Sequence, residues 1–192
     1  MHAIVPAAGG SGRMGRLKPL LDVGGRPMLL SVLDALLAGG AATATVVVRS
    51  ELATQLSELR PAVTIALNDD PKSAMIDSVR LGMQAGARIA PPATGYVICP
   101  CDVAGLDAHD VRRCVEAFAD TPDRIVIATY AGRRGHPIVI PASLAEVVRS
   151  PECDAGLNRL ARGRPKLVRE IACDSPATIS NINTPDDYAR LR

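Results

Sequence analysis

A glycine-rich segment near the start of the sequence is well suited to binding a charged ligand. Residues 6–18 read PAAGGSGRMGRLK and follow an apolar run, Ala3-Ile4-Val5, that predicts a short buried strand. Glycines let a backbone approach a ligand closely, and successive N–H groups in such a loop can form an anion site. Arg13 and Lys18 at the far end of the segment could neutralise a polyphosphate. We therefore interpret it as a nucleoside triphosphate loop.

Residues 10–15, GSGRMG, also match the dinucleotide-binding fingerprint G-x-G-x-x-G. That fingerprint opens directly into a helix and is followed, about 20 positions later, by an acidic residue after the next strand. Here Pro19 and Gly24-Gly25 interrupt the chain, and Arg49 follows the second predicted strand. A Walker loop also fails, because no Lys-Ser or Lys-Thr closes the glycine run. An NAD-dependent oxidoreductase is thus a remote alternative.

Asp102 directly follows an apolar run, 96–99, that predicts a buried strand. A carboxylate there would lie at the carboxyl edge of the sheet and could hold Mg²⁺ together with substrate phosphates. The alternative is an ordinary turn or capping aspartate. An amide oxygen of Asn181 could help to complete a metal shell, whereas Asn183 or Thr184 could cap the last helix. We favour the metal role for Asp102.

Two further polar groups have weaker signals. His136 lies in a predicted loop, Gly135-His136-Pro137, and a lone histidine is more often structural or exposed than catalytic. The neighbouring Arg133 and Arg134 would nonetheless suit a phosphorylated acceptor. Cys101 has no histidine or basic partner near it in sequence, so we expect it to be packing material.

These residues are positioned by apolar segments that alternate with helical periodicities, which predicts a three-layer α/β/α, Rossmann-like fold with a mostly parallel mixed sheet. Ser73 is expected to cap the third helix, whose inner face is predicted to use Met75, Ile76, Val79 and Met83. The predicted strands cover 3–5, 45–48, 63–67, 96–99, 125–128, 138–140 and about 166–171. The predicted helices cover about 28–37, 51–59, 74–83, 108–118, 143–149, 155–160 and the residues from 185.

The composition narrows the function classes. The chain has 192 residues, which suits a single domain over 1–192, and 47% of them are hydrophobic. Aromatic residues make up only 2%, and the net charge is +2, so neither nucleic acid nor a membrane is an expected partner. No signal peptide or long apolar stretch is present, and we expect a cytoplasmic protein. Five irregularly spaced cysteines predict reduced, mostly buried thiols.

Taken together, these segments resemble the small nucleotidyltransferases that activate the molybdenum cofactor. The resemblance spans essentially the whole chain in the right order: PAAGGSGRMGRLK, Cys99-Pro100-Cys101-Asp102, Gly135-His136-Pro137, Asp154-Ala155-Gly156-Leu157 and Asn181-Ile182-Asn183-Thr184-Pro185. It implies a nucleotidyltransferase fold and transfer of a nucleotide monophosphate from an NTP to a phosphorylated acceptor, with release of pyrophosphate. The Ala-Ala-Gly opening, the Gly-His-Pro segment and the late Asp-x-Gly are similar to the cytidylyltransferase branch. The Cys-Pro-Cys-Asp and Asn-x-Asn-Thr-Pro segments are more similar to the guanylyltransferase branch. We favour CTP over GTP, with a molybdopterin-type acceptor.

The resemblance also implies roles for individual residues. The loop Ala7, Ala8, Gly9, Gly10, Ser11 and Gly12 would wrap the nucleotide, with Arg13 and Lys18 on its phosphates. Asp69 or Asp70 would lie near the nucleoside, and His136 would contact substrate. Asp102 would hold Mg²⁺ opposite Asn183 or Asn181, and a molybdoenzyme or cofactor-insertion protein could be a partner.

Departures from the family pattern leave the base and the acceptor open. The third helix lacks the glycine usual before its serine, Arg49 replaces an asparagine of guanylyl enzymes, and Val103-Ala104 replaces a proline-containing sequence. The alternatives are a GTP-dependent guanylyltransferase, another phosphorylated acceptor such as a sugar phosphate or phospholactate, and a non-catalytic nucleotide-binding module.

Overall fold

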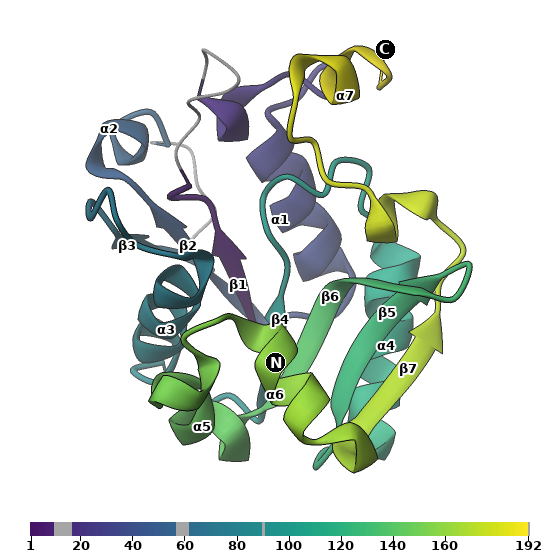
Figure 1. The fold of residues 1–192 in the computed structure, drawn as a ribbon. Helices are drawn as coiled ribbons and strands as arrows, with labels where there is room; N and C mark the ends of the chain where they lie inside the picture. The colour runs from purple at the N-terminus through teal and green to yellow at the C-terminus, as the bar shows by residue number, and fades with distance from the viewer. Residues whose placement is uncertain (10–16, 57–61, 90, 192) are drawn as a thin grey trace.

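The fold is built on a seven-stranded sheet in a computed structural model that describes residues 1–9, 17–56, 62–89 and 91–191. The strands lie in the order β3-β2-β1-β4-β6-β5-β7 (Figure 1). The strands from β3 to β4 in this order are parallel, β6 is antiparallel to both of its neighbours, and β7 is parallel to β5. This confirms the predicted mixed sheet. The bounds are β1 (His2–Pro6), β2 (Thr43–Val48), β3 (Val63–Leu67), β4 (Gly95–Ile98), β5 (Ile125–Tyr130), β6 (Arg133–Pro141) and β7 (Val168–Ala172).

Helices cover both faces of this sheet and confirm the three-layer architecture (Figure 1). Ala3 and Val5 of β1 belong to the hydrophobic layer under α1 and α4, whereas Ile4 belongs to the layer under α3, α5 and α6. Successive side chains of a strand point to opposite faces, so one buried strand serves both layers. The helices are α1 (Met28–Ala38), α2 (Ser50–Ala53), α3 (Met75–Gly86), α4 (Ala108–Asp120), α5 (Ala145–Arg149), α6 (Leu157–Gly163) and α7 (Pro185–Ala189), with 3-10 segments η1 (Lys18–Leu20), η2 (Ala142–Leu144), η3 (Pro151–Cys153), η4 (Pro165–Leu167) and η5 (Pro176–Ile179).

Within the described ranges, no helix combines the length and the apolar character needed to cross a membrane. α2 is shorter than the helix predicted at 51–59, and residues 57–61 lie outside the described part of the chain. Of the two caps predicted for the last helix, Thr184 is the one observed, because its side chain accepts a hydrogen bond from the Asp187 N–H at α7. The Asp107 side chain likewise caps α4 and accepts a 2.7 Å hydrogen bond from the His109 N–H.

The β5–β6 connection differs from its prediction. β6 begins at Arg133, five residues before the predicted strand, so His136 lies in a strand and not in a loop. The turn consists of Ala131 and Gly132, whose φ angles are 48° and 74°. Two consecutive residues with positive φ make the tight turn that joins antiparallel strands, and the hairpin therefore extends almost to its tip.

The start of α3 also corrects two predictions. Ser73 does not cap the helix; its hydroxyl donates to the Asp70 carbonyl, and the N-cap residue is Ala74. The predicted burial of Met75 is wrong, because 56% of it is exposed. Met75 keeps the four-residue spacing to the buried Val79 and Met83, but it is the first residue of α3, and burial along this face begins only at Ile76.

Candidate active site

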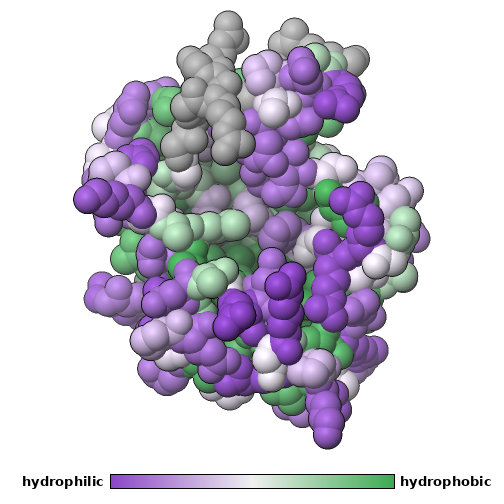
Figure 2. Space-filling view, viewed as in Figure 1, coloured by the Kyte–Doolittle hydropathy of each residue, from purple (hydrophilic) through white to green (hydrophobic). Residues whose placement is uncertain are grey.

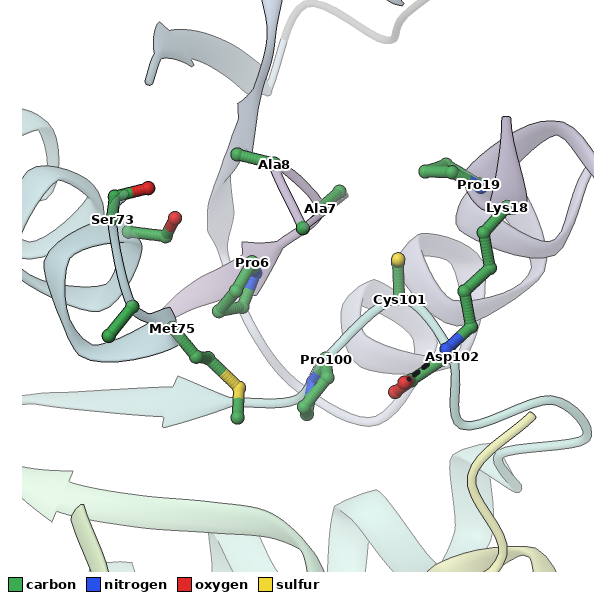
Figure 3. A pocket seen from close by; sticks show the side chains of 13 residues that line it. Pro6, Ala7, Ala8, Lys18, Pro19, Ser73, Met75, Pro100, Cys101 and Asp102 are labelled. Carbon is green, nitrogen blue, oxygen red and sulfur yellow. Dashed lines mark hydrogen bonds and ion pairs between the residues drawn. The ribbon is translucent and has the colours of Figure 1, made fainter. Parts of the chain in front are cut away.

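A pocket of about 210 Å³ lies at the carboxyl ends of the adjacent parallel strands β1 and β4 (Figure 3). The chain after β4 stays paired with β1, because the Cys99 N–H donates to the Ile4 carbonyl and the Cys101 N–H to the Pro6 carbonyl. This pairing sets Asp102 beside the start of the glycine-rich loop. The first pocket is lined by Pro6, Ala7, Ala8, Gly9, Lys18, Pro19, Ser73, Ala74, Met75, Ser78, Pro100, Cys101 and Asp102.

Lys18 and Asp102 meet at one side of the first pocket, and Figure 3 shows the lysine side chain reaching the carboxylate. The Lys18 Nζ lies 2.7 Å from Oδ2 of Asp102 and donates a further hydrogen bond of 3.1 Å to Oδ1 of Asn183. The Lys18 and Asp102 side chains are only 17% and 16% exposed, so their interaction is less screened than that of a surface ion pair. Two oxygen-bearing side chains thus converge on one positive charge.

The C-terminal segment is attached to Asp102 by its backbone and by a side chain. The Ile182 N–H donates to the Asp102 carbonyl at 2.9 Å, and the Asn181 Nδ2 donates to Oδ1 of Asp102 at 3.2 Å. Ile182 is buried beside Leu21. Thr184 caps α7, which leaves Asn183 facing Lys18. The two asparagines therefore face the site differently: Asn183 presents an oxygen to the lysine, and Asn181 presents an N–H group to the carboxylate.

The thiols beside the pocket are buried and neutral. Burial, reinforced by the Asp102 carboxylate, raises the pKa of the Cys101 thiol to about 12 and that of Cys99 well above its ordinary value. The thiolate is the nucleophilic form of cysteine, so Cys101 is poorly suited to covalent catalysis. All five cysteines are buried and free, as expected from their spacing.

Arg49 and Asp69 lie on the β2–β3 side of the same sheet edge. The Arg49 Nε donates to the Ala8 carbonyl at 3.0 Å, and the arginine thereby holds the end of the β1 segment. Both Asp69 carboxylate oxygens accept hydrogen bonds from Ser50, which lower the pKa of Asp69. Asp69 does not line the first pocket as the structure describes it. The contact of Arg49 with Ala8 has no sequence signal beyond the position of the arginine after a strand.

A second pocket, of about 290 Å³, adjoins the first and shares Met75 and Pro100 with it. His136 lies here and not beside Lys18. Its Nδ1 is buried without a hydrogen-bond partner among the described residues, and burial lowers its pKa. The Arg134 side chain at this pocket is ion-paired with Glu170 at 2.6 Å. The remaining lining is Ile76, Val79, Ile98, Ile127, Gly135, Ile138, Ala155, Gly156, Leu157 and Asn158.

The expected roles of Gly10, Ser11, Gly12 and Arg13 fall on residues outside the described ranges. Among the described residues, a further group of potential metal ligands consists of His109, Asp110 and Asp174, none of which lines either pocket. The buried Asp110 carboxylate accepts the backbone N–H groups of Asp174 and Ser175, so it holds the chain after β7 in place. We assign this group a structural role.

Known proteins share this sequence pattern. Residues 3–170 match the family model described as the MobA-like NTP transferase domain. The chain belongs to this family. The resemblance to molybdenum cofactor nucleotidyltransferases is confirmed, and membership supports nucleotidyl transfer from a bound NTP as the activity.

The named relatives of this chain include both an oxidoreductase and a cytidylyltransferase. Nicotine blue oxidoreductase of Paenarthrobacter nicotinovorans is 30% identical over 199 residues, covering 98% of this chain and 94% of that protein. The 2-C-methyl-D-erythritol 4-phosphate cytidylyltransferase of Streptomyces coelicolor is 31% identical over 197 residues, covering 98% of this chain and 64% of the relative. Rv0371c of Mycobacterium tuberculosis H37Rv has a similar fold, with a TM-score of 0.85 at 25% identity over 99% of this chain and 95% of that one. A complex of Rv0371c with manganese gives a TM-score of 0.76 at 24% identity, over 99% of this chain and 96% of that one.

Proposed function

We propose that this protein transfers a nucleotide monophosphate, CMP by preference, from an NTP to a phosphorylated acceptor and releases pyrophosphate. The observation that carries the proposal is the convergence of Lys18, Asp102 and Asn183 at the first pocket. A partly buried ammonium group can bind phosphate oxygens, and the carboxylate beside it can hold a divalent metal that neutralises them. The family assignment supports the same reaction type.

The donor set around Lys18 fits a divalent metal. Carboxylate and amide oxygens are hard ligands of the kind that Mg²⁺ and Mn²⁺ prefer, and here they already surround an ammonium group. We assign the metal to Asp102 and Asn183, with Asn181 orienting the carboxylate through its N–H group. The manganese complex of Rv0371c supports a divalent metal. When bound, such a metal supplies charge neutralisation to phosphate oxygens.

The chain's own residues would act by positioning and by charge. An oxygen of the acceptor phosphate attacks the α-phosphorus of the NTP, the bond from that phosphorus to the β-phosphate oxygen breaks, and pyrophosphate leaves. We assign Lys18 and Arg13 to the negative charge that develops on the departing pyrophosphate. No covalent nucleophile is needed, in keeping with the neutral thiol of Cys101.

The second pocket supports a ring-bearing acceptor of the molybdopterin type over a sugar phosphate. Its walls include Ile76, Ile98 and Ile127, whereas a sugar would need several hydrogen-bond partners for its hydroxyls. His136 and Arg134 are polar groups that could orient such an acceptor. The cytidylyltransferase relative supports CTP as the donor. Delivery of the product to a molybdoenzyme or insertion protein is the corresponding partner hypothesis.

The decisive experiment is a pyrophosphate-release screen. CTP, GTP, ATP and UTP are each incubated with the protein, magnesium or manganese, and acceptors that include a molybdopterin, a hexose phosphate and phospholactate. We expect acceptor-dependent release, fastest with CTP and molybdopterin, and none with Asp102→Ala. If none of the four NTPs gives pyrophosphate release under any of these conditions, the proposal is overturned. A preference for GTP would correct only the identity of the base.

A second candidate is reduction of an organic substrate by a nicotinamide cofactor, because one relative across the whole chain is an oxidoreductase. Arg49 follows β2 in place of the acidic residue that binds the ribose of NAD, so NADPH is the nicotinamide cofactor to test. The discriminating measurement is a titration with NADPH followed by cofactor fluorescence. Tight NADPH binding together with failure of the pyrophosphate screen would favour this candidate.

A further inference from the structure

Met75 is exposed at the place where the two pockets meet. It lines both of them, and only Pro100 does the same among the described lining residues. Among the residues that the structure describes, the exposed large hydrophobic side chains are Leu67, Met75 and Leu191. Of these three, Met75 alone lines either of the two pockets. Figure 3 shows its side chain extending from the start of α3 toward Pro100.

This exposure does not come from a loosely held helix end. The Asp77 carboxylate accepts the Ala74 N–H at 2.9 Å and thereby caps α3 directly before Met75. Arg80 binds Asp77 and donates to the Val148 carbonyl at 3.0 Å and the Ser150 carbonyl at 2.8 Å. Through Asp77 and Arg80, these bonds tie the start of α3 to the C-terminal end of α5, so the Met75 side chain projects from a fixed backbone.

The surroundings make an exposed thioether informative. The face shown in Figure 2 is largely hydrophilic, with its hydrophobic colour gathered toward the centre. Apolar surface is stabilised by removal from water, and a flexible, polarisable thioether packs well against ring systems. Because Met75 borders two adjoining pockets, one side chain can contact a ligand in each.

We propose that Met75 is a substrate-contacting residue that packs against the nucleotide in the first pocket and the acceptor in the second, and becomes buried when they bind. This inference rests on the proposed function, because it requires the first pocket to hold a nucleotide. The inference adds to the proposed function a single side chain that contacts both substrates. Met75 has the spacing of the core face of α3 but is exposed at the pockets.

Oxidation rates test the burial directly. Hydrogen peroxide transfers an oxygen atom to the methionine sulfur, giving the sulfoxide and water, and the rate depends on access to the sulfur. The rate at Met75 is measured by peptide mass spectrometry with and without CTP and magnesium, and then with GTP. We expect at least about a threefold slowing at saturating nucleotide. The fully buried Met28 and Met83 serve as internal references, with slow rates that nucleotide does not change.

Substitution tests the contribution to binding. Met75→Ser should weaken nucleotide binding about 3- to 10-fold by calorimetry, and Met75→Leu, which keeps an apolar side chain, should weaken it less. Leu67→Ser is the matched control, because Leu67 is 51% exposed and lines neither pocket. All three variants should keep the thermal midpoint of the wild type within a few degrees, since both side chains are exposed.

The outcomes separate this inference from the proposed function. Nucleotide binding with unchanged Met75 oxidation and an unchanged Met75→Ser affinity would overturn the Met75 contact and leave nucleotidyl transfer standing. Absence of nucleotide binding to the wild type, together with no pyrophosphate release, would overturn both. Protection of Met75 by CTP or GTP, with weaker binding by Met75→Ser, supports the contact.

Discussion

The Lys18 ammonium lies 2.7 Å from the Asp102 carboxylate although 84 positions separate them in sequence. The contact joins η1, which follows the glycine-rich segment, to the segment after β4. Each partner is held from elsewhere as well, because Asn183 accepts from Lys18 and Asn181 donates to Asp102. These neighbours hold both charges at the pocket, where they can act on a charged ligand.

Replacing either member of this pair should stop turnover without unfolding the protein. We expect Lys18→Ala and Asp102→Asn to lower the rate of pyrophosphate release by at least about 100-fold, because each removes a charge that acts on the phosphates. The rate is measured at saturating substrates, and circular dichroism checks the fold. Lys72→Ala removes an exposed lysine outside both pockets and is the matched control. Near-normal rates in Lys18→Ala would contradict the assignment.

The two asparagines should respond differently to conversion to aspartate. Asn183→Asp keeps an oxygen toward Lys18, so we expect the magnesium concentration for half-maximal activity to change only a few-fold. Asn181→Asp replaces an N–H donor by a second negative charge beside Asp102, and we expect loss of at least about tenfold in apparent metal affinity. Manganese binding followed by electron paramagnetic resonance gives the affinity without turnover. A larger loss of metal affinity in Asn183→Asp than in Asn181→Asp would contradict the roles assigned to the two asparagines.

The apolar and helical patterns predict the layers because burial imposes them locally. Val46, Val97 and Val126 are fully buried strand residues. Strands that are buried on both faces consist of nearly continuous apolar runs, and such runs can be recognised in the sequence. Asp102 and Lys18 are predictable as residues at one sheet edge, since parallel strands bring their carboxyl ends together.

The parts that sequence reasoning misses depend on geometry between distant segments. The helical pattern alone does not separate Met75 from Ile76, because neighbouring apolar residues at a helix start can each be read as the inner face. His136 requires the turn at Ala131 and Gly132 before its strand can be placed. The hydrogen bond from Arg49 to Ala8 joins side chain to backbone across two strands and has no local pattern. The different roles of Asn181 and Asn183 depend on which side-chain atoms face Asp102 and Lys18, and the sequence does not specify this.

Arg80 should contribute more to stability than an ordinary surface arginine. Its guanidinium binds two carbonyls and two carboxylates, of which Asp154 is 2.6 Å away. A lysine lacks the planar fork needed for these contacts, so Arg80→Lys should lose about 1–2 kcal/mol of unfolding free energy in urea titrations. Arg149→Lys is the control: Arg149 pairs with the exposed Glu146, and this substitution should cost less than about 0.5 kcal/mol. Equal losses in both variants would contradict the special role of Arg80.

His2 should make the protein less stable in mild acid. Its ring lies buried in β1, with its two nitrogens 2.8 Å and 2.9 Å from the hydroxyls of Thr43 and Thr45. Burial, with a smaller effect of the N-terminal charge, lowers the pKa of His2 from 6.5 to about 4. Between these values the unfolded chain binds the proton and the native state does not, so stability falls as the pH drops from about 6.5 toward 4.

The size of this effect is on the order of 2 kcal/mol between about pH 7 and pH 4, and urea unfolding across that range measures it. His2→Gln should flatten the dependence, whatever its own cost at neutral pH, because glutamine does not titrate. Part of the slope should remain, since burial also lowers the pKa of His136. Nuclear magnetic resonance of the imidazole carbons gives the His2 pKa directly. A native-state value near 6.5 would contradict the assignment, because native and unfolded states would then take up the proton together.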